Sequence, residues 1–306
     1  MTPAPFVIVV GNCTVDLSFA VPRFPKAGET LLALERHVDL GGKGANQAMV
    51  AHRFGIETLL AAPIGRDAEG DWACAQLAAE GLPPAGIQRT DTATDQSIIY
   101  VTPDGENSIV SSHRAAAQAT ADWATAVIAA APAGAHLLMQ GNLSLATTCA
   151  ALGAARARGL PTIMNPAPIQ YAYDKVFPLT DLVVLNEIEA VELGRRSDPI
   201  AAGQAIQDGG VATVIVTLGA DGAVLIAGEA PIRFPAPRVA AVDSVGAGDV
   251  FCGALAACHA RDMAIATAIQ IAIEAASLAV TRRGTQASFP SAAEAAAILL
   301  RHRIQR

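Results

Sequence analysis

Short apolar runs alternate with alanine-rich stretches along most of this chain, and this alternation limits its fold more than any other feature of the sequence. The clearest apolar run is residues 211–217, in which valine and isoleucine dominate. Strands of this kind are buried on both faces, and parallel strands need crossover connections that are usually helices. We therefore expect an α/β protein with a mainly parallel sheet and helices on both of its faces.

The expected elements follow one another in strand–helix order. The pattern predicts strands at 7–10, 58–62, 136–140, 162–165, 182–185 and 211–217, and helices at 45–54, 67–80, 145–158, 187–193, 247–260, 263–281 and 291–303. Two segments with proline and glycine turn signals, about 14–40 and 97–112, interrupt this order. We predict that they pair as a small antiparallel sheet, a lid on a single domain 1–306. The alternative is two ordinary excursions from the main sheet.

Composition and charge exclude several classes of protein. Hydrophobic residues make up 52% of the 306 residues and charged residues only 16%, which excludes a disordered chain. The 21 Lys and Arg residues against 28 Asp and Glu residues give a net charge of −7, so we expect no nucleic acid partner. No uninterrupted apolar run reaches the ~18 residues of a membrane span, so we expect no membrane partner.

The cysteines and the first residues bear on the compartment. The five cysteines are scattered and form no C-x-x-C pair, which is typical of reduced thiols in the cytoplasm. The opening MTPAPFVIVVGN lacks the basic region and the long apolar core of a secretory signal. We therefore expect a cytoplasmic protein.

A first glycine cluster, GGKGANQ at residues 41–47, stands just before a predicted helix. Glycines let the backbone approach a ligand closely, and the start of a helix offers free N–H groups and a positive dipole end. Lys43 and Asn46 add donors that suit hydroxyl groups or an oxyanion. A ligand site is the favoured interpretation, and a tight turn with a helix cap is the alternative.

A second cluster, DSVGAGD at residues 243–249, also precedes a predicted helix. The N–H groups of Ala247, Gly248 and Asp249 would face an anion as that helix begins. The Asp249 carboxylate in the first turn is either a helix cap or a base that accepts a proton from a hydroxyl attacking phosphorus. The cluster alone does not choose between these two roles.

Polar residues also follow several predicted strands, at the edge where open α/β sheets bind ligands. Asn186 and Glu189 are three residues apart, so they share one side of a first helical turn and suit hydrated Mg²⁺ near phosphates. The alternative for Glu189 is a solvated carboxylate. Thr217 and the glycines after it suit a phosphate contact, and the alternative there is a hairpin turn between 211–217 and 223–226.

Neither cluster matches the P-loop or the dinucleotide fingerprint, which disfavours P-loop NTPases and classical reductases. The clusters instead resemble the two signatures of the ribokinase-like (PfkB) carbohydrate kinases. GGKGANQA at 41–48 is similar to the first signature and DSVGAGD to the second. The likeness covers nearly the whole chain and includes, in the family's order, FPKAGET (24–30), NPAP (165–168), NEIE (186–189), TLGADG (217–222) and VTRRGTQASFP (280–290).

The resemblance implies ATP-dependent transfer of a phosphoryl group to a hydroxymethyl group of ribose or a related sugar. It makes Asp249 the base, in an anion hole formed with Gly246, Ala247 and Gly248. It assigns the sugar to Thr14, Asp16, Gly42, Lys43, Gly44, Asn46 and Asn142, and ATP to Asn186, Thr217, Gly219 and Gly222. It places water-mediated Mg²⁺ at Asn186 and Glu189, and a monovalent cation such as K⁺ at Asp243, Val245, Ala279, Arg282, Gly284 and Ser288. It also implies a homodimer formed through the lid.

Two positions depart from the family's ribose-phosphorylating members. Thr14 stands where they usually have Asn, and Asn142 stands where they usually have a sugar-contacting Glu. An amide donates and accepts, whereas a carboxylate only accepts, so the set of hydroxyls that can be paired changes. A nucleoside kinase of the same family and a non-catalytic sugar- or nucleotide-binding regulator therefore stay open as alternatives.

Overall fold

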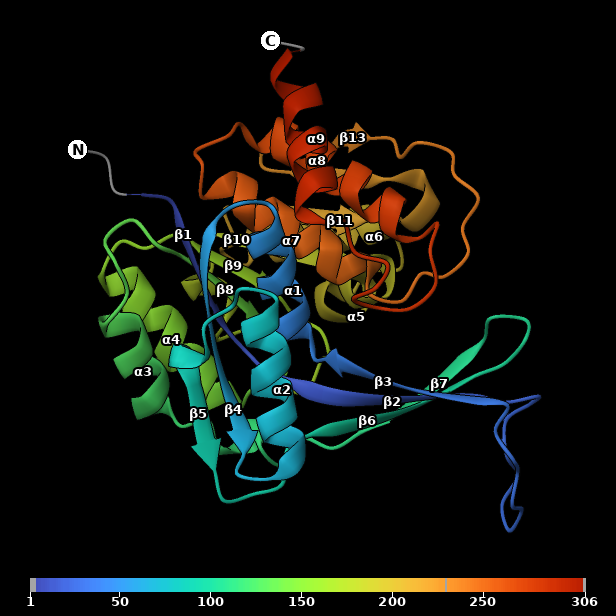
Figure 1. Cartoon of the computed structure of the whole chain (residues 1–306). Coiled ribbons are helices and arrows are strands. Elements are labelled where there is room, and N and C mark those ends of the chain that lie inside the picture. Colours follow the sequence, from blue (N-terminus) through green and yellow to red (C-terminus); the bar gives the residue numbers. More distant parts are fainter. Residues whose placement is uncertain (1–3, 229, 305–306) are drawn as a thin grey trace.

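A large, mostly parallel sheet forms the centre of the computed structural model, which describes residues 4–228 and 230–304 (Figure 1). Over these described residues the strand order is β13-β12-β11-β10-β9-β8-β1-β4-β5. Neighbours from β11 to β5 pair in parallel, and β12 is antiparallel to β11 and β13. The strands are β1 (Phe6–Val10), β4 (Glu57–Gly65), β5 (Ile87–Thr90), β8 (His136–Gln140), β9 (Thr162–Asn165), β10 (Leu182–Asn186), β11 (Thr213–Thr217), β12 (Ala223–Ile226) and β13 (Ile232–Phe234).

Helices cover both faces of this sheet, as the sequence predicts. One face carries α1 (Lys43–Arg53), α2 (Ala68–Ala79), α7 (Ala247–His259), α8 (Ile265–Ala279) and α9 (Ala292–Ile304). The other carries α3 (Ala121–Ala129), α4 (Leu145–Ala157), α5 (Glu187–Gly194) and α6 (Pro199–Asp208). None of the helices in the described ranges is long and apolar enough to cross a membrane.

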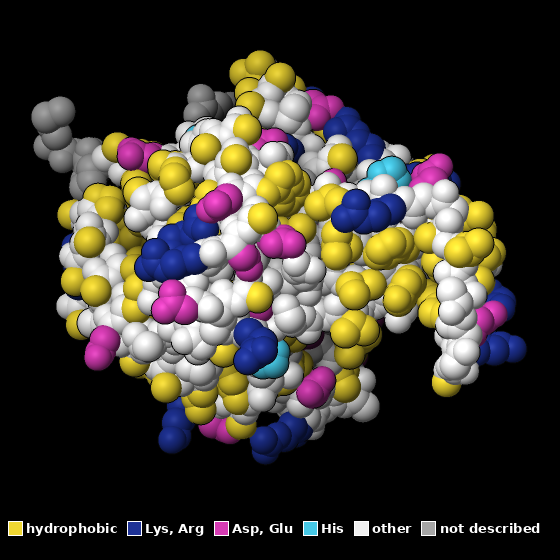
Figure 2. Space-filling view, turned by 60° about the horizontal axis from the view of Figure 1, so that its bottom comes forward, with side chains coloured by type: hydrophobic (Ala, Val, Ile, Leu, Met, Phe, Trp, Pro, Cys, Tyr) yellow, Lys and Arg dark blue, Asp and Glu magenta, His cyan; other side chains and the backbone are white. Residues whose placement is uncertain are grey.

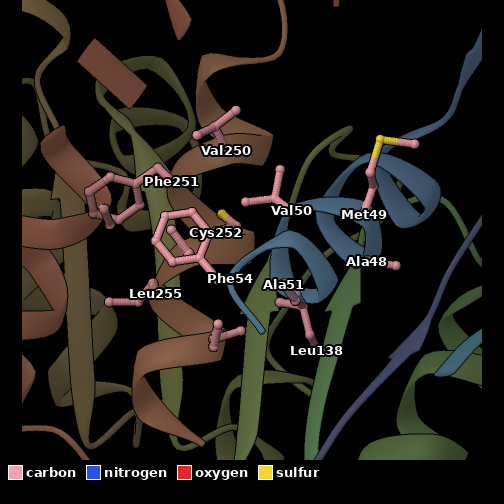
Figure 3. Packing of buried hydrophobic residues seen from close by; sticks show 14 of the residues in the cluster. Ala48, Met49, Val50, Ala51, Phe54, Leu138, Val250, Phe251, Cys252 and Leu255 are labelled. Atoms are coloured by element: carbon pink, nitrogen blue, oxygen red, sulfur yellow. The ribbon is translucent and has the colours of Figure 1, made fainter. Parts of the chain in front are cut away.

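Two hydrophobic cores result, because successive strand residues point to opposite faces. Along β1, Val7 and Val9 join the core under α1 and α7, whereas Ile8 and Val10 join the core under α3 and α4. Figure 3 shows side chains of α1 and α7 meeting in the first core, above Leu138 of the sheet. The packing of these two helices brings their N-terminal ends together.

A second, smaller sheet has the order β3-β2-β6-β7 and extends from one edge of the domain (Figure 1). Its strands are β2 (Thr14–Ala20), β3 (Glu35–Gly41), β6 (Gln96–Val101) and β7 (Asn107–Ser111). The predicted pairing of the two segments is confirmed, but the prediction of a purely antiparallel sheet is wrong. β2 and β6 pair in parallel, because each belongs to its own antiparallel pair and the two pairs lie side by side. We call this sheet the lid sheet.

The predicted elements match the structure to within a few residues, and the described part of the chain also contains elements that apolar periodicity does not predict. They include α3, α6, β5 and β13. Thr120 accepts from the N–H of Trp123 at the start of α3, and Asp198 accepts from the N–H of Ala201 at the start of α6. Such caps are local start signals that stand outside the apolar pattern.

Candidate active site

Asp249 lies where the N-terminal turns of α1 and α7 face each other. It is 5% exposed. Its Oδ2 accepts from Asn46 Nδ2 at 3.0 Å, and its Oδ1 accepts from Gln47 Nε2 at 3.0 Å. Lys43 Nζ is 3.6 Å from Oδ1. The structure therefore joins the two glycine clusters through one buried carboxylate, as expected if Asp249 serves a site and not only a helix end.

Gln47 and its neighbours form a buried amide network beside Asp249. Gln47 Nε2 also donates to Asn165 Oδ1 at 3.2 Å, and Gln47 Oε1 accepts from Gln140 Nε2 at 2.8 Å. Asn165 Nδ2 in turn donates to the carbonyl oxygen of Val184 at 3.1 Å. Gln47 and Gln140 are fully buried. Burying an amide is costly without hydrogen bonds, so these contacts fix the surroundings of the carboxylate. Gln140 Oε1 has no partner among the described residues.

The N-terminus of α7 provides free backbone donors next to Asp249. Gly246 is the residue before the helix and has φ 79°, a conformation that favours glycine. A Cβ there would lie 2.7 Å from the Phe289 ring. The N–H of Ala247 donates to the carbonyl oxygen of Ser244, but among the described residues none accepts from the N–H of Gly248 or Asp249. Two of the predicted anion-hole donors are thus available to a ligand.

The N-terminus of α1 is held by the end of β1. The N–H of Gly44 donates to Asn12 Oδ1 at 3.2 Å, and the N–H of Ala45 donates to the carbonyl oxygen of Asn12. A Cβ at Gly44 would lie 2.6 Å from the backbone of Asn12. Gly42 precedes the helix with φ 90°. The glycines of the first cluster therefore let α1 start against β1, and the N–H of Gly44 is already used there.

Thr14 and Asp16 reach the site from the lid sheet. The Thr14 hydroxyl donates to Asp16 Oδ1 at 2.7 Å, and both residues are buried. The Asp16 carboxylate lies directly on Gly41, where no side chain would fit. Burial raises the pKa of Asp16, and the negative charges of Asp39 and Asp249 act in the same direction. A buried carboxylate with one committed oxygen is suited to accept hydrogen bonds from hydroxyl groups.

A pocket of about 230 Å³ opens beside Asp249. Its polar lining includes Lys43, Asn165, Asn186, Glu189, Thr217, Ser244 and Asp249, with backbone from Gly246 and Gly248. The negative charge of Asp249 raises the pKa of Lys43, so the ammonium group stays charged in the pocket. A pocket with a cation and helix N–H groups suits an anionic ligand such as a phosphate chain.

Asn186 and Glu189 form a capping box at the start of α5. Glu189 accepts from the N–H and the Nδ2 of Asn186, and Asn186 Oδ1 accepts from the N–H of Glu189. Burial raises the pKa of Glu189, and the charge of Lys43 opposes that rise. The pair therefore caps a helix and borders the pocket at the same time.

The structure separates the other predicted residues into three groups. Thr217 lines the pocket, while Gly219 and Gly222 lie in the turn of a β11–β12 hairpin, the alternative interpretation of this segment. Asp243 accepts from the N–H groups of Val245 and Gly284, which brings the two predicted cation-binding segments together. Arg282 forms an ion pair with Glu294, the carbonyl oxygen of Ala279 accepts from the Arg282 N–H, and Ser288 donates to the carbonyl oxygen of Thr285.

Asn142 stands apart from the pocket lining. Its Oδ1 is buried, and among the described residues it has no hydrogen-bond partner. An unpaired buried acceptor costs about 1–3 kcal/mol unless a ligand or water pairs it. Asn142 follows β8, whose last residue Gln140 belongs to the amide network, so the orphaned oxygen lies close in sequence to the site.

Sequence reasoning misses the roles of Gln47, Gln140 and Gln286. Gln47 stands inside the first cluster, and a glutamine beside Asn46 on a helix that packs on the sheet must find a buried partner. Gln286 Nε2 donates to Asn46 Oδ1 at 2.9 Å. These contacts join residues 93 to 240 positions apart, and nothing local in the sequence marks them.

Comparison with known proteins agrees with this geometry. The model of the pfkB family carbohydrate kinases matches residues 4–292. Ribokinase of Mus musculus is 34% identical over 298 residues, which cover 93% of this chain and 91% of that protein. Deoxyribokinase of Salmonella typhi is 30% identical over 295 residues, with 93% and 95% covered. The structure of Arabidopsis thaliana ribokinase complexed with ribose and ATP has a TM-score of 0.86 and 26% identity, with 97% and 99% covered.

The α/β fold with a lid sheet, the buried carboxylate, the free helix N–H groups and the polar pocket fit a phosphotransferase. The chain belongs to the pfkB family of carbohydrate kinases. It is accordingly an ATP-dependent sugar kinase.

Proposed function

We propose that this kinase transfers the γ-phosphoryl group of ATP to a hydroxymethyl group of ribose or a close relative, with Asp249 as the base. The observation that carries the proposal is the buried Asp249 carboxylate. It is held by Asn46 and Gln47 at the point where the N-terminus of α7 meets the pocket. The mouse and Arabidopsis ribokinases support a ribose-like acceptor.

In the proposed reaction the hydroxymethyl oxygen attacks the γ-phosphorus, and the bond between that phosphorus and its bridging oxygen to the β-phosphate breaks. The hydroxyl proton passes to Asp249, and the products are ADP and the sugar phosphate. The N–H groups of Gly248 and Asp249 would hold the phosphoryl oxygens, and Lys43 adds positive charge. Phosphoryl transfer depends mostly on such positioning and charge neutralisation.

Asn186 and Glu189 fit a hydrated Mg²⁺ better than a directly bound one. The two Glu189 oxygens already accept from Asn186, which leaves lone pairs for the water ligands that Mg²⁺ retains. When bound there, Mg²⁺ would offset the charge of the phosphate chain. Thr217 at the end of β11 lies on the same pocket wall and would contact that chain.

The sugar would bind between the lid sheet and α1. Asp16 would accept hydrogen bonds from sugar hydroxyls, and the amide nitrogen of Asn46 would donate one. Thr14 orients Asp16, and Gly42 would contribute its backbone. Asn142 would pair its free Oδ1 with a sugar hydroxyl. We propose Thr14 and Asn142 as the residues that set the acceptor. ATP consumption measured over pentoses, deoxyribose, hexoses and nucleosides tests this, and a clear preference for ribose would make both positions tolerated variations.

Asp243 and the segment 279–288 are our proposed site for a monovalent cation. The hydrogen bonds from Val245 and Gly284 to Asp243 draw this segment against the start of the anion hole. A cation on the backbone carbonyls there would stabilise that geometry. If so, K⁺ raises the turnover number at fixed ionic strength relative to a large organic cation.

The outer face of the lid sheet is our proposed dimer interface. Val38, Leu17, Ile98 and Val110 are paired in register across all four strands, so they share one face. Val38 is 36% exposed, Ile98 38% and Val110 67%. Figure 2 shows hydrophobic side chains gathered where the lid sheet lies, on the right of the view. A face this apolar is typical of an interaction surface. Sedimentation of the unchanged protein and of a Val110→Lys variant, compared for oligomeric state, tests the proposal.

The state of the cysteines supports our proposal of a reducing, cytoplasmic location. Each of the five cysteines is free, and Cys13, Cys252 and Cys258 are buried. Free buried thiols behave as small hydrophobic residues and persist where the compartment is reducing.

The experiment that tests the central proposal is Asp249→Asn. The amide keeps the size of the side chain but cannot take the hydroxyl proton. We therefore expect turnover to fall by roughly 10²–10⁴-fold while ATP affinity is nearly unchanged. Initial rates and ATP titration by calorimetry measure the two quantities separately. Ordinary turnover in the variant would remove Asp249 from the role of base.

A further inference from the structure

Each amide that holds Asp249 is itself held by a second amide. Asn46 accepts from Gln286 and donates to Asp249, so the order is Gln286 to Asn46 to Oδ2. Gln47 accepts from Gln140 and donates to Asp249, so the order is Gln140 to Gln47 to Oδ1. Two relays of donor and acceptor therefore end on the two oxygens of one carboxylate.

The direction of each relay matters because an amide has two unlike ends. Its nitrogen only donates and its oxygen only accepts. If the Asn46 amide turned by half a rotation, its oxygen would face Asp249 Oδ2, and two acceptors would repel each other. A donor on the far side of Asn46 prevents this rotation, since it requires the oxygen to stay there.

Gln47 and Asn46 differ in how firmly they are held. The nitrogen of Gln47 donates to Asn165 as well as to Asp249, and Asn165 is fixed by the carbonyl oxygen of Val184. Gln47 is thus oriented from two sides even without Gln140. For the oxygen of Asn46, Gln286 is the donor that the described part of the chain provides.

Gln286 stands in the loop between α8 and α9, which is pinned to the helix that carries Asn46. Arg53, at the end of α1, donates to the carbonyl oxygens of Gln286 and Phe289 at 3.4 and 3.5 Å. Arg53 also pairs with Glu80 at 2.9 Å. The backbone that carries the Gln286 side chain is therefore held by contacts outside the pocket.

We propose that Gln286 is a positioning residue for the reaction: by donating to Asn46 Oδ1, it keeps the Asn46 amide turned so that its nitrogen holds Asp249 Oδ2. The proposal rests on the proposed role of Asp249 as base. Gln286 itself touches neither carboxylate oxygen, and it acts through Asn46.

Two variants of Gln286 separate polarity from packing. Gln286→Glu keeps the shape but offers only acceptors, so it draws the Asn46 nitrogen away from Asp249. Gln286→Leu removes the donor yet leaves Asn46 free to keep its contact. We expect kcat to fall by about 10²-fold in the Glu variant, the scale of a misplaced catalytic group. The Leu variant should fall several-fold less, and the KM for ATP should stay unchanged in both.

A pH profile adds a second readout. In Gln286→Glu the introduced carboxyl group regains a donor when it is protonated, so the kcat of this variant relative to the unchanged protein should rise as the pH is lowered from 8 to 5.5. Gln76→Glu, on the exposed face of α2, is the matched control and should leave kcat unchanged. Thermal unfolding should show that both Gln286 variants remain folded at the assay temperature.

The outcomes are distinguishable. A Leu variant as slow as the Glu variant, or a Glu variant with unchanged kcat, would overturn the positioning role while leaving the base untouched. If Asp249→Asn keeps ordinary turnover, the proposed function itself fails. A flat pH ratio for Gln286→Glu would also count against the orientation mechanism.

Discussion

At the scale of single residues, Asn142 offers a test in which the effect on protein stability and the effect on sugar binding can be measured separately. Its buried, unpaired Oδ1 contributes nothing favourable to folding, and in the proposed site a sugar hydroxyl would pair it. Asn142→Leu should therefore leave the free energy of unfolding within about 1 kcal/mol, because an unpaired acceptor is replaced by an apolar group. The KM for the sugar should rise about tenfold, the worth of one hydrogen bond.

Urea unfolding and initial rates over a range of sugar concentrations measure these two effects. Asn107→Leu, on the exposed strand β7, serves as the control for an asparagine replaced away from the site. An Asn142 variant that is strongly destabilised, with an unchanged KM, would mean that this side chain is structural.

The residue scale also shows where sequence reasoning stops. Lys43, Asn46 and Asp249 can be predicted because each stands in a glycine-rich segment before a helix, a local pattern with a physical reason. Gln47, Gln140 and Gln286 cannot, because what matters in them is the partner, and each partner comes from a distant segment. Nothing in a lone glutamine tells a solvated surface position from a place in a buried network.

At the scale of elements, the contact between α1 and α7 sets the position of Asp249, the proposed base. Gly253 on α7 lies one turn after Asp249, and a Cβ there would be 2.6 Å from the carbonyl oxygen of Gln47 and 2.7 Å from Val50. Gly253→Ala should force the helices apart and move Asp249 from its amides. We expect a loss of stability of about 1–3 kcal/mol and a loss of turnover greater than the lost folded fraction.

Gly153→Ala is the matched control for that variant. Gly153 also lies inside a helix, α4, but a Cβ there would meet open space. The same substitution should raise stability by about 0.5–1 kcal/mol through helix propensity, with turnover unchanged. Thermal unfolding with activity assays on both variants checks the pair, and equal effects would show that the packing of α1 on α7 does not control the position of Asp249.

The elements also show which parts of the fold a sequence pattern can reach. The buried strands β8 and β9 are predicted to the residue, since continuous apolar runs end sharply at polar positions. The parallel pairing of β2 with β6 is not predicted, because it depends on how two separate antiparallel pairs meet, which alternation along one strand does not encode.

At the scale of the whole molecule, two histidines couple folding to pH. His136 starts β8 and His259 ends α7, and their rings meet edge to face with centroids 4.9 Å apart. Burial lowers the pKa of His136 to about 4, helped by the charge of His259, while Asp181 and Asp262 oppose the shift. Burial lowers the pKa of His259 as well.

Between the lowered and the ordinary histidine pKa, these two side chains therefore bind protons in the unfolded chain but not in the folded protein. Stability is full above the ordinary histidine pKa near 6.5 and falls as the pH drops toward 4. For His136 alone the loss is about 3 kcal/mol over that range. Urea unfolding at pH 7.5 and pH 5 should show a smaller difference for His136→Phe than for the unchanged protein. His37→Gln, at an exposed position, should keep the full difference.

The amide relays also determine at what stage of folding the candidate active site can form. Asn46 and Asp249 are 203 positions apart, and Gln286 is 240 positions from Asn46. Until Asp249 has been synthesised, Asn46 and Gln47 of α1 lack the carboxylate to which they donate in the folded protein. A nascent chain that ends before Asp249 lacks the proposed base, and a chain that ends before Gln286 lacks the donor to Asn46. After dilution from denaturant, the rate at which activity returns should therefore follow the folding of the entire domain. It should not follow the earlier formation of its helices.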